Sequence, residues 1–396
     1  MWTSARASEK LEVYYVEPIG GHRGMHYYDF ELCLALRSLG VDVTLLTCDE
    51  TRCVSIPGAL PVEFPFRGIY GDASKALRGL RYLRGLLRIG LAMQRRDIPL
   101  AHFHYFHFPP VDYLYHTWLR ALGKRYVLTV HDVVPFDAKA SHLSWLRRLY
   151  HGADRIIVHA HSNCDAIVQG FGISRDKVGV IPMGPYLSFA DRQDLPASVA
   201  KQRLGLAPDA PVVMFFGQIK RVKGLQYLIH AFREVLEHYP RAHLLIVGPE
   251  WKESFGPYAA LVDRLRLGDN VSTRIEYIPD EEVGLYFSAA DVVALPYTEC
   301  YQSAVLYMAH SFARPVVASA VGGLAEVVRD GVTGWLVPPA DAPRLAKAIL
   351  ALLGDLTMAR TMGERAREMV GTQYGWPAIA QETATVYAEA LEIDRV

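Results

Sequence analysis

Short apolar runs alternate with helical patterns along the whole chain. The runs at Leu11–Glu17, Val41–Thr47, Tyr126–Val130 and Pro211–Phe216 have the length of buried strands. Between such runs, apolar residues recur every three or four positions, as in Leu225–Tyr239, which is typical of helices that pack on a sheet. Strands that alternate with helices need crossover connections, and these predict parallel sheets. The expected fold class is therefore α/β.

The same strand–helix pattern fills both halves of the chain. A polar segment, Ser188–Pro208, separates them, and we expect one small helix in it near Val199–Leu204. The length of 396 residues also favours two domains. We predict a Rossmann-like domain over residues 1–187, a second over residues 188–373, and a C-terminal helix over 374–396 that returns to the first domain. A ligand-binding cleft between the two domains is the expected site.

Composition excludes several classes of function. The chain has 42 basic and 42 acidic residues, so a nucleic-acid partner is not expected. No apolar run is long enough to cross a bilayer, and the N-terminal residues lack the apolar core of a secretion signal. The cysteines show no spacing typical of a zinc site or a disulfide framework, which favours a reducing, cytoplasmic location. They are Cys33, Cys48, Cys53, Cys164 and Cys300.

The segment Ser74–Asp97 has the pattern of a basic amphipathic helix, because leucines follow one helical face and no acidic residue lies inside the segment. One interpretation is contact with an anionic membrane surface, at the inner face of the membrane. The alternative is a surface helix with solvated arginines, or arginines that meet a charged acceptor. The leucines are Leu77, Leu80, Leu83, Leu87 and Leu91, and the basic residues are Lys75, Arg78, Arg81, Arg84, Arg88, Arg95 and Arg96.

Histidines are concentrated in the strand-like run Leu100–Phe108. His102 and His104 alternate along the strand and share one face, whereas His107 lies on the other. Without a nearby carboxylate cluster, we expect buried, hydrogen-bonded imidazoles rather than metal ligands. A further histidine, His131, follows the strand Tyr126–Val130 at its carboxyl end, which is a ligand-facing position in a parallel sheet.

Two loops in the second half have the character of phosphate-binding loops. Tyr297–Ser303 and Val321–Gly323 each follow a short apolar strand and lead into a helix, and Glu326 is expected at the start of the second helix. Backbone N–H groups at such helix starts favour anions. The glycines at Gly20–Gly24 do not have the spacing of a dinucleotide-binding loop. A ligand that carries phosphate groups is therefore one interpretation; the alternative is that the two loops are ordinary strand–helix turns, which are common in this fold class.

With these motifs, the chain resembles the retaining glycosyltransferases of the GT-B fold, family 4-like (glycosyl transferases group 1), over nearly its whole length. The resemblance implies two facing Rossmann-like domains with a deep cleft between them, and sugar transfer from a nucleotide-diphosphate sugar with retention of the anomeric configuration. The motifs that carry it are FFGQIKRVKGLQYLIHAF, LLIVG, DVVALPY, RPVVAS with VGGLAEVVRDGVTGWLVPP, and the segment Tyr374–Trp376.

The resemblance also implies roles for individual residues. Lys223 matches the family lysine on the donor diphosphate, and Gln218 stands where an arginine is usual. Cys300 and Met308 occupy the two family glutamate positions, so Glu299, one residue earlier, is the candidate replacement. The catalytic residues implied are His131, Lys223 and Glu299. The implied donor-binding residues are Gly21, Gly217, Gln218, Lys223, Tyr301, Gln302, Ser303, Ala304 and Val305.

The predicted reaction is transfer from a UDP-sugar or GDP-mannose to a glycan, a lipid-linked acceptor or a small molecule. No cofactor and no metal are expected, since the chain has no Asp-x-Asp motif. Three alternatives stay open at this point: a sugar-nucleotide epimerase of the same fold, a non-catalytic carbohydrate-binding relative, and a dehydrogenase. The dehydrogenase is disfavoured because neither glycine-rich loop has the dinucleotide spacing.

Overall fold

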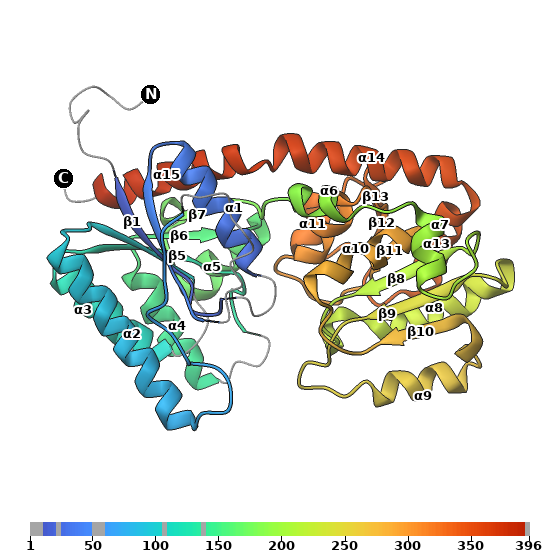
Figure 1. Cartoon of the computed structure of the whole chain (residues 1–396), viewed down its shortest axis with the longest axis horizontal. Helices are drawn as coiled ribbons and strands as arrows, with labels where there is room; N and C mark the ends of the chain where they lie inside the picture. Colours follow the sequence, from blue (N-terminus) through green and yellow to red (C-terminus); the bar gives the residue numbers. More distant parts are fainter. Residues whose placement is uncertain (1–10, 21–24, 50–59, 105–108, 136–139, 393–396) are drawn as a thin grey trace. The chain divides into compact units, whose positions relative to one another are not determined.

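The computed structural model describes residues 11–20, 25–49, 60–104, 109–135 and 140–392. The chain divides into two units. Unit 1 comprises Met1–Gly184 together with Trp376–Val396, and unit 2 comprises Pro185–Gly375. Each unit is built on a parallel sheet with helices on both faces (Figure 1). None of the helices in the described ranges has both the length and the apolar character that a bilayer crossing requires.

Unit 1 contains a seven-stranded sheet in the order β3-β2-β1-β4-β5-β6-β7. Every neighbouring pair is parallel, as the alternation of strands and helices predicts. The strands are almost fully buried, apart from the two edge strands β3 and β7, because helices cover both faces of the sheet. The strands are β1 (Glu12–Val16), β2 (Asp42–Leu46), β3 (Val62–Glu63), β4 (Leu100–His104), β5 (Arg125–Thr129), β6 (Arg155–Val158) and β7 (Val178–Val180).

The helices of unit 1 fall into two layers. One layer holds α1 and α15, which pack on each other, and α15 also contacts β5 and β6 (Figure 1). The opposite layer holds α2, α3 and α4. Helix α3 was not predicted; it begins with two prolines, which the first turn of a helix tolerates. The helices are α1 (Met25–Ser38), α2 (Lys75–Arg95), α3 (Pro109–Ala121), α4 (Ala140–Gly152), α5 (His161–Phe171) and α15 (Trp376–Glu392).

Unit 2 contains a six-stranded parallel sheet in the order β10-β9-β8-β11-β12-β13. Helices α8, α9 and α13 form one layer on it, and α10, α11 and α14 belong to the other. The strands are β8 (Val212–Phe216), β9 (His243–Val247), β10 (Val271–Arg274), β11 (Val292–Leu295), β12 (Val316–Ser319) and β13 (Gly334–Val337). The helices are α8 (Leu225–His238), α9 (Gly256–Arg264), α10 (Asp280–Ala289), α11 (Ala304–Ser311), α12 (Gly322–Val327), α13 (Ala342–Gly354) and α14 (Leu356–Gln373).

Two local predictions for unit 2 were wrong. The polar segment 188–208 holds two helices, α6 (Leu187–Gln193) and α7 (Ala197–Arg203), rather than one. The polar composition gave no sign that this segment packs on the domain. Lys201 is nevertheless almost fully buried, and its ammonium group lies 2.8 Å from an Asp291 carboxylate oxygen. Glu326 lies in the last turn of α12 rather than at its start, because the helix already begins at Gly322.

Candidate functional site

The strands β8 and β11 lie side by side and parallel in unit 2, but the strands that follow each of them are added on opposite sides of the pair. From β8 the chain continues to β9 and β10 on one side, and from β11 it continues to β12 and β13 on the other. Ligands of open α/β sheets bind at the carboxyl ends of the strands where this reversal occurs. The loops at this point are 217–224, after β8, and 296–303, after β11.

These two loops are in direct contact. The backbone N–H of Thr298 donates to the Val222 carbonyl at 2.9 Å. Gly224 has a positive φ of 66°, and a Cβ there would lie 1.8 Å from the carbonyl oxygen of Pro296. A Cβ on Gly217 would lie 3.3 Å from a methyl group of Val305. The starts of α8 and α11 are therefore held at one place on the sheet edge.

Replacing Gly224 with alanine is expected to lower the free energy of unfolding of unit 2 by about 3 kcal/mol. The left-handed backbone costs an alanine roughly 1–2 kcal/mol, and the overlap with a backbone carbonyl adds strain of about the same size. Gly205→Ala is the matched control, because Gly205 also has a positive φ but has open space around it. Urea unfolding measures both variants, and equal losses would contradict the close approach of the two loops.

Lys223 lies at the contact between the loops. Its ammonium nitrogen is 3.7 Å from the centre of the Tyr297 ring, which is a cation–π contact. Tyr297 is fully buried, and its hydroxyl group is 3.4 Å from the hydroxyl of Ser303. Tyr297 was not among the predicted site residues; its position directly after Pro296, at the end of a buried strand, was the available signal. The ring fixes the lysine beside the start of α11.

Backbone N–H groups without a hydrogen-bond partner in the described part of the chain lie at the start of α11, next to the contact between the two loops. Within the described residues, the backbone N–H groups of Gln302, Ser303, Ala304 and Val305 donate no hydrogen bond. They form the start of α11, where the helix dipole adds positive potential. The side-chain oxygen of Gln302 is buried and has no hydrogen-bond partner in this part of the chain. The arrangement can accept an anion and, beside it, a ligand group that donates a hydrogen bond.

The remaining predicted residues of unit 2 are placed as follows. Glu299 is exposed in the loop after β11 and makes no hydrogen bond or ion pair with another described residue. The thiol of Cys300 lies 3.3 Å from the Gln302 carbonyl oxygen. Gln218 and Tyr301 lie in the two loops, and Met308 lies inside α11. The structure therefore brings Lys223 and the start of α11 together and leaves Glu299 facing solvent.

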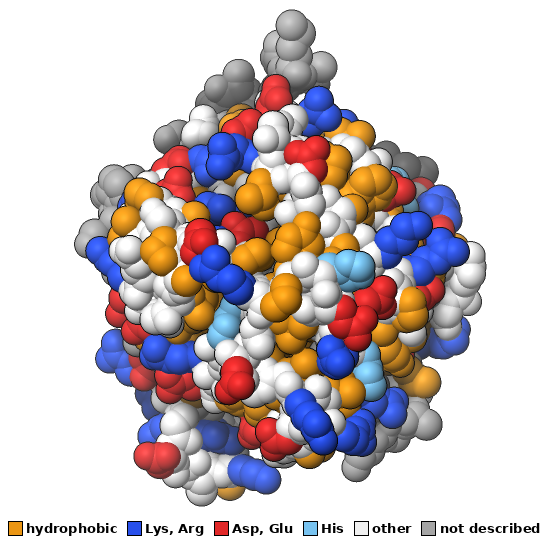
Figure 2. All heavy atoms as spheres, turned by 90° about the vertical axis from the view of Figure 1, so that its right-hand side faces the viewer, with side chains coloured by type: hydrophobic (Ala, Val, Ile, Leu, Met, Phe, Trp, Pro, Cys, Tyr) orange, Lys and Arg blue, Asp and Glu red, His pale blue; other side chains and the backbone are white. Residues whose placement is uncertain are grey.

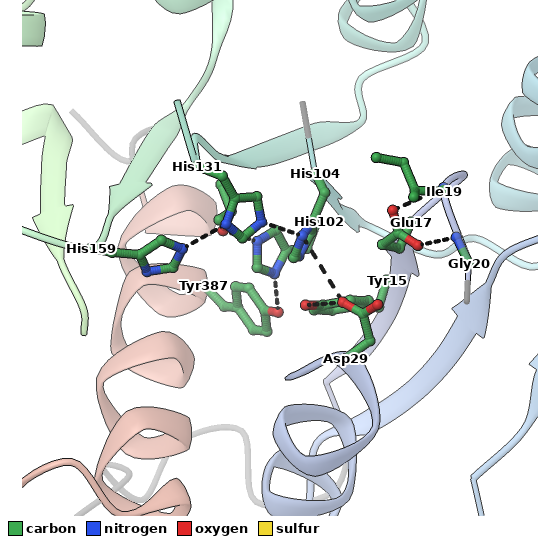
Figure 3. Close-up of polar contacts among 11 residues, drawn as sticks. Tyr15, Glu17, Ile19, Gly20, Asp29, His102, His104, His131, His159 and Tyr387 are labelled. Carbon is green, nitrogen blue, oxygen red and sulfur yellow. Dashed lines mark hydrogen bonds and ion pairs between the residues drawn. The ribbon is translucent and has the colours of Figure 1, made fainter. Parts of the chain in front are cut away.

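In unit 1, three histidines form a hydrogen-bonded chain across the carboxyl ends of β4, β5 and β6 (Figure 3). His104 Nδ1 is 2.9 Å from His131 Nε2, and His131 Nδ1 is 2.9 Å from His159 Nε2. His159 Nδ1 ends the chain, 2.9 Å from the carbonyl oxygen of Ile181. We call this set the histidine chain. Its members share a position at or just after the end of a strand, and that shared position was the sequence signal for it.

The Ile181 carbonyl sets the tautomer of each ring in the histidine chain. A carbonyl only accepts, so His159 carries its proton on Nδ1 and accepts at Nε2 from His131. By the same rule His131 accepts at Nε2 from His104. Burial lowers the pKa of all three rings, to about 4 for His159 and well below the usual value for the other two. All three are neutral at pH 7.

Acidic and phenolic groups lie beside the histidine chain (Figure 3). The Tyr15 hydroxyl donates to Asp29 at 3.2 Å, and burial raises the pKa of the Asp29 carboxyl well above its usual range, helped by Glu17. Glu17 accepts from the backbone N–H groups of Ile19 and Gly20 and so fixes the chain after β1. His102 lies between the Tyr387 hydroxyl, at 2.7 Å, and that of Thr129, at 2.6 Å.

The predictions for unit 1 have mixed outcomes. His102 and His104 share one face, because both rings contact Tyr15. Among the described residues, no group of three or more His, Cys, Asp or Glu side chains is arranged to hold a metal ion. His131 is buried, and both its nitrogens are engaged by other histidines. Gly21 and His107 lie outside the described residues, and the role implied for His131 stays a prediction.

The chain has two Rossmann-like α/β units, and one of them places a lysine near a helix start where its strand order reverses. This arrangement is typical of enzymes that bind phosphate-bearing ligands. Comparison with known proteins gives the family. Residues 22–187 match the model of Glycosyltransferase Family 4, and residues 210–355 match that of Glycosyl transferases group 1. The chain belongs to the family 4 glycosyltransferases of the GT-B fold.

Individual relatives support this assignment. The chain is 30% identical to a D-inositol 3-phosphate glycosyltransferase of Kineococcus radiotolerans, over 94% of this chain and 92% of the relative. The corresponding enzyme of Kribbella flavida is 29% identical over 94% and 92%. Sucrose-phosphate synthase from Thermosynechococcus elongatus shares the fold, with a TM-score of 0.75 at 23% identity over 97% of this chain and 100% of that one. Anabaena HepE, solved in complex with UDP-glucose, aligns at a TM-score of 0.74 and 19% identity, over 95% and 99%.

Proposed function

We propose that the protein transfers a sugar from a nucleotide-diphosphate sugar to a hydroxyl acceptor, with retention of the anomeric configuration. The contact of Lys223 with Tyr297 carries the proposal. The Tyr297 hydroxyl lies 3.4 Å from that of Ser303, so the lysine and the four consecutive N–H groups at the start of α11 belong to the same edge of unit 2. The donor diphosphate is the ligand that such a site fits. A UDP-sugar is the first choice, since a structural neighbour was solved with UDP-glucose, and GDP-mannose is the alternative.

In the proposed reaction, the bond between the anomeric carbon and the diphosphate oxygen breaks, and the acceptor oxygen bonds to that carbon on the same face. The acceptor proton passes to the departing phosphate oxygen, so no enzymatic nucleophile takes part. Negative charge grows on the diphosphate as the bond stretches. Lys223 and the N–H groups at the start of α11 stabilise that charge because they are already in place. Among the expected acceptors are glycans, lipid-linked sugars and small molecules, and the expected location is the cytoplasm.

Thermal unfolding with nucleotides tests the binding half of the proposal. At about 100 times the dissociation constant, a ligand adds roughly 2.7 kcal/mol of stability. For a unit of this size, that raises the unfolding midpoint by roughly 5–10 °C. We expect this shift with UDP or GDP and a much smaller one with UMP or GMP, which lack the β-phosphate. Equal shifts with mono- and diphosphates would contradict a diphosphate site.

A transfer assay tests the chemistry. Release of the nucleoside diphosphate from its sugar, dependent on an added acceptor and accompanied by an α-linked product from an α-linked donor, is the expected result. A donor epimer formed without acceptor would instead indicate the epimerase alternative. Inversion at the anomeric carbon would contradict the retaining mechanism.

A further inference from the structure

Helix α2 is fixed on unit 1 by a closely packed face. Its buried side chains are Tyr82, Leu86, Ile89 and Met93. Two glycines on that face allow near contact: a Cβ on Gly85 would lie 2.8 Å from the Pro65 carbonyl oxygen, and one on Gly90 would lie 2.1 Å from the Trp118 ring. Because larger side chains would clash there, the helix cannot rotate about its axis to bury a different face.

The opposite face of α2 leaves a row of leucines in solvent. These side chains are between 42% and 62% exposed, and they follow one another along about 20 Å of helix at a rise of 1.5 Å per residue. Single exposed leucines are ordinary, whereas a continuous row marks an interaction surface. We call this set the leucine ridge. Its members are Leu77, Leu80, Leu83, Leu87 and Leu91.

Unpaired arginines run beside the leucine ridge. Arg84, Arg88 and Arg95 are exposed, and within the described residues no acidic side chain forms an ion pair with any of them. We call them the arginine flank. Arg81 and Arg96 differ, because Arg81 donates to the Gly68 carbonyl, and Arg96 donates to the Tyr14 hydroxyl and forms an ion pair with Glu63 at 3.5 Å. The sequence has no acid between Asp72 and Asp97. By contrast, basic and acidic side chains are interspersed on the face drawn in Figure 2.

We propose that α2 docks this protein on the surface of a lipid bilayer that contains anionic lipids. The leucine ridge enters the boundary between headgroups and acyl chains, and the arginine flank contacts the phosphates of the headgroups. The charge of this face favours a lipid bilayer over a protein partner. Helix α2 presents arginines and no acid of its own, although Glu63 of β3 borders it at Arg96. Such a face is complementary to a uniformly anionic surface, whereas the average protein surface carries both signs. The proposal does not depend on the sugar-transfer reaction.

Flotation of the full-length protein with lipid vesicles tests the proposal. The two preparations are phosphatidylcholine alone and phosphatidylcholine mixed with phosphatidylglycerol. One variant, Leu80→Ser with Leu87→Ser, removes the middle of the leucine ridge. The other, Arg84→Gln with Arg88→Gln and Arg95→Gln, removes the arginine flank. The matched controls change exposed residues elsewhere: Leu39→Ser with Leu356→Ser, and Arg264→Gln with Arg360→Gln and Arg365→Gln.

The wild type is expected to bind the anionic vesicles and to bind the neutral ones much more weakly. Each basic residue at an anionic surface contributes about fivefold, so loss of the arginine flank lowers binding by roughly 100-fold. Loss of two ridge leucines lowers it by roughly tenfold or more. Both controls retain wild-type binding, and all variants keep the wild-type unfolding temperature.

Several results would overturn the docking proposal. They are absence of wild-type binding, equal binding to neutral and anionic vesicles, and ridge and flank variants that bind like the controls. Capture of a protein partner by α2 without vesicle binding would also overturn it. Nucleotide binding, measured on the same samples, reports on the sugar-transfer proposal separately, so a failure of one proposal is distinguishable from a failure of the other.

Discussion

Replacing Lys223 with alanine is expected to lower kcat/KM for sugar transfer by about 10²–10³-fold, the loss typical of removing one preorganised group from a developing anion. The arginine that is usual in this loop, and that would share the charge of the donor diphosphate with Lys223, is absent. Gln218 stands where the family resemblance implies an arginine, and the Lys220 ammonium lies 5.2 Å from the Trp251 ring centre, on a different side chain. The cation–π contact with Tyr297 holds Lys223 in place before the donor binds.

The measurement uses the nucleotide sugar whose nucleoside diphosphate gives the larger thermal shift. Lys220→Ala is the matched control, because it removes a positive charge from the same loop without touching Tyr297; we expect less than a tenfold loss from it. Lys223→Arg is expected to recover part of the binding, since it keeps the charge with a different shape. If Lys223→Ala binds the nucleoside diphosphate and turns over as the wild type does, the site in unit 2 is not the donor site.

Most strands could be predicted from sequence because parallel sheets bury their strands on both faces. Continuous apolar runs such as those of β8, β11 and β12 are then hard to mistake. The glycosyltransferase class followed from a family resemblance in the motifs that contain these strands and the segments after them. Helices α3 and α6 were harder, because their prolines and polar residues resemble loop chemistry, and only tertiary packing selects the helix.

The candidate sites show a similar division. The family resemblance implied that Lys223 and the loop before α11 both contact the donor diphosphate, and the structure places that loop and the loop of Lys223 after neighbouring strands. The sequence did not predict the Tyr297 contact or the tautomers of the histidine chain, since these depend on side chains that meet across the sheet. It also identified the leucines of α2 as one face, but not that a different face, held by Gly85 and Gly90, would be the buried one.

Mild acid is expected to destabilise unit 1 strongly. Burial lowers the pKa of His102 and His116 to about 3 and that of His159 to about 4, whereas the unfolded chain takes up these protons near pH 6.5. Below pH 6.5 the unfolded state therefore binds more protons, and stability falls as the pH falls. At pH 5 each of these histidines costs about 2 kcal/mol, or about 6 kcal/mol for the three.

Other buried groups in unit 1 modify this loss without reversing it. His104 and His131 add to it, because burial and the neighbouring histidines lower their pKa values too. Asp29 acts in the opposite direction. Its folded-state pKa is raised, chiefly by burial, so it adds stability as the pH falls toward the pKa of an unfolded aspartate. One carboxyl offsets only part of the effect of five histidines. Unit 2 is expected to lose less, since burial lowers the pKa of fewer of its described histidines: His310, to about 3, and the partly buried His243.

Urea unfolding from pH 7 to pH 5, read by pulsed hydrogen exchange at a common labelling pH, separates peptides of β4–β6 from those of β8 and β11. His159→Gln removes one titrating ring and should reduce the loss between pH 7 and pH 5 by about 2 kcal/mol. His142→Gln, at an exposed position of α4, is the control and should leave the loss unchanged. If unit 1 were equally stable at pH 7 and pH 5, its histidines would have to gain protons without unfolding. That result would contradict a folded state in which the histidine chain is buried and neutral.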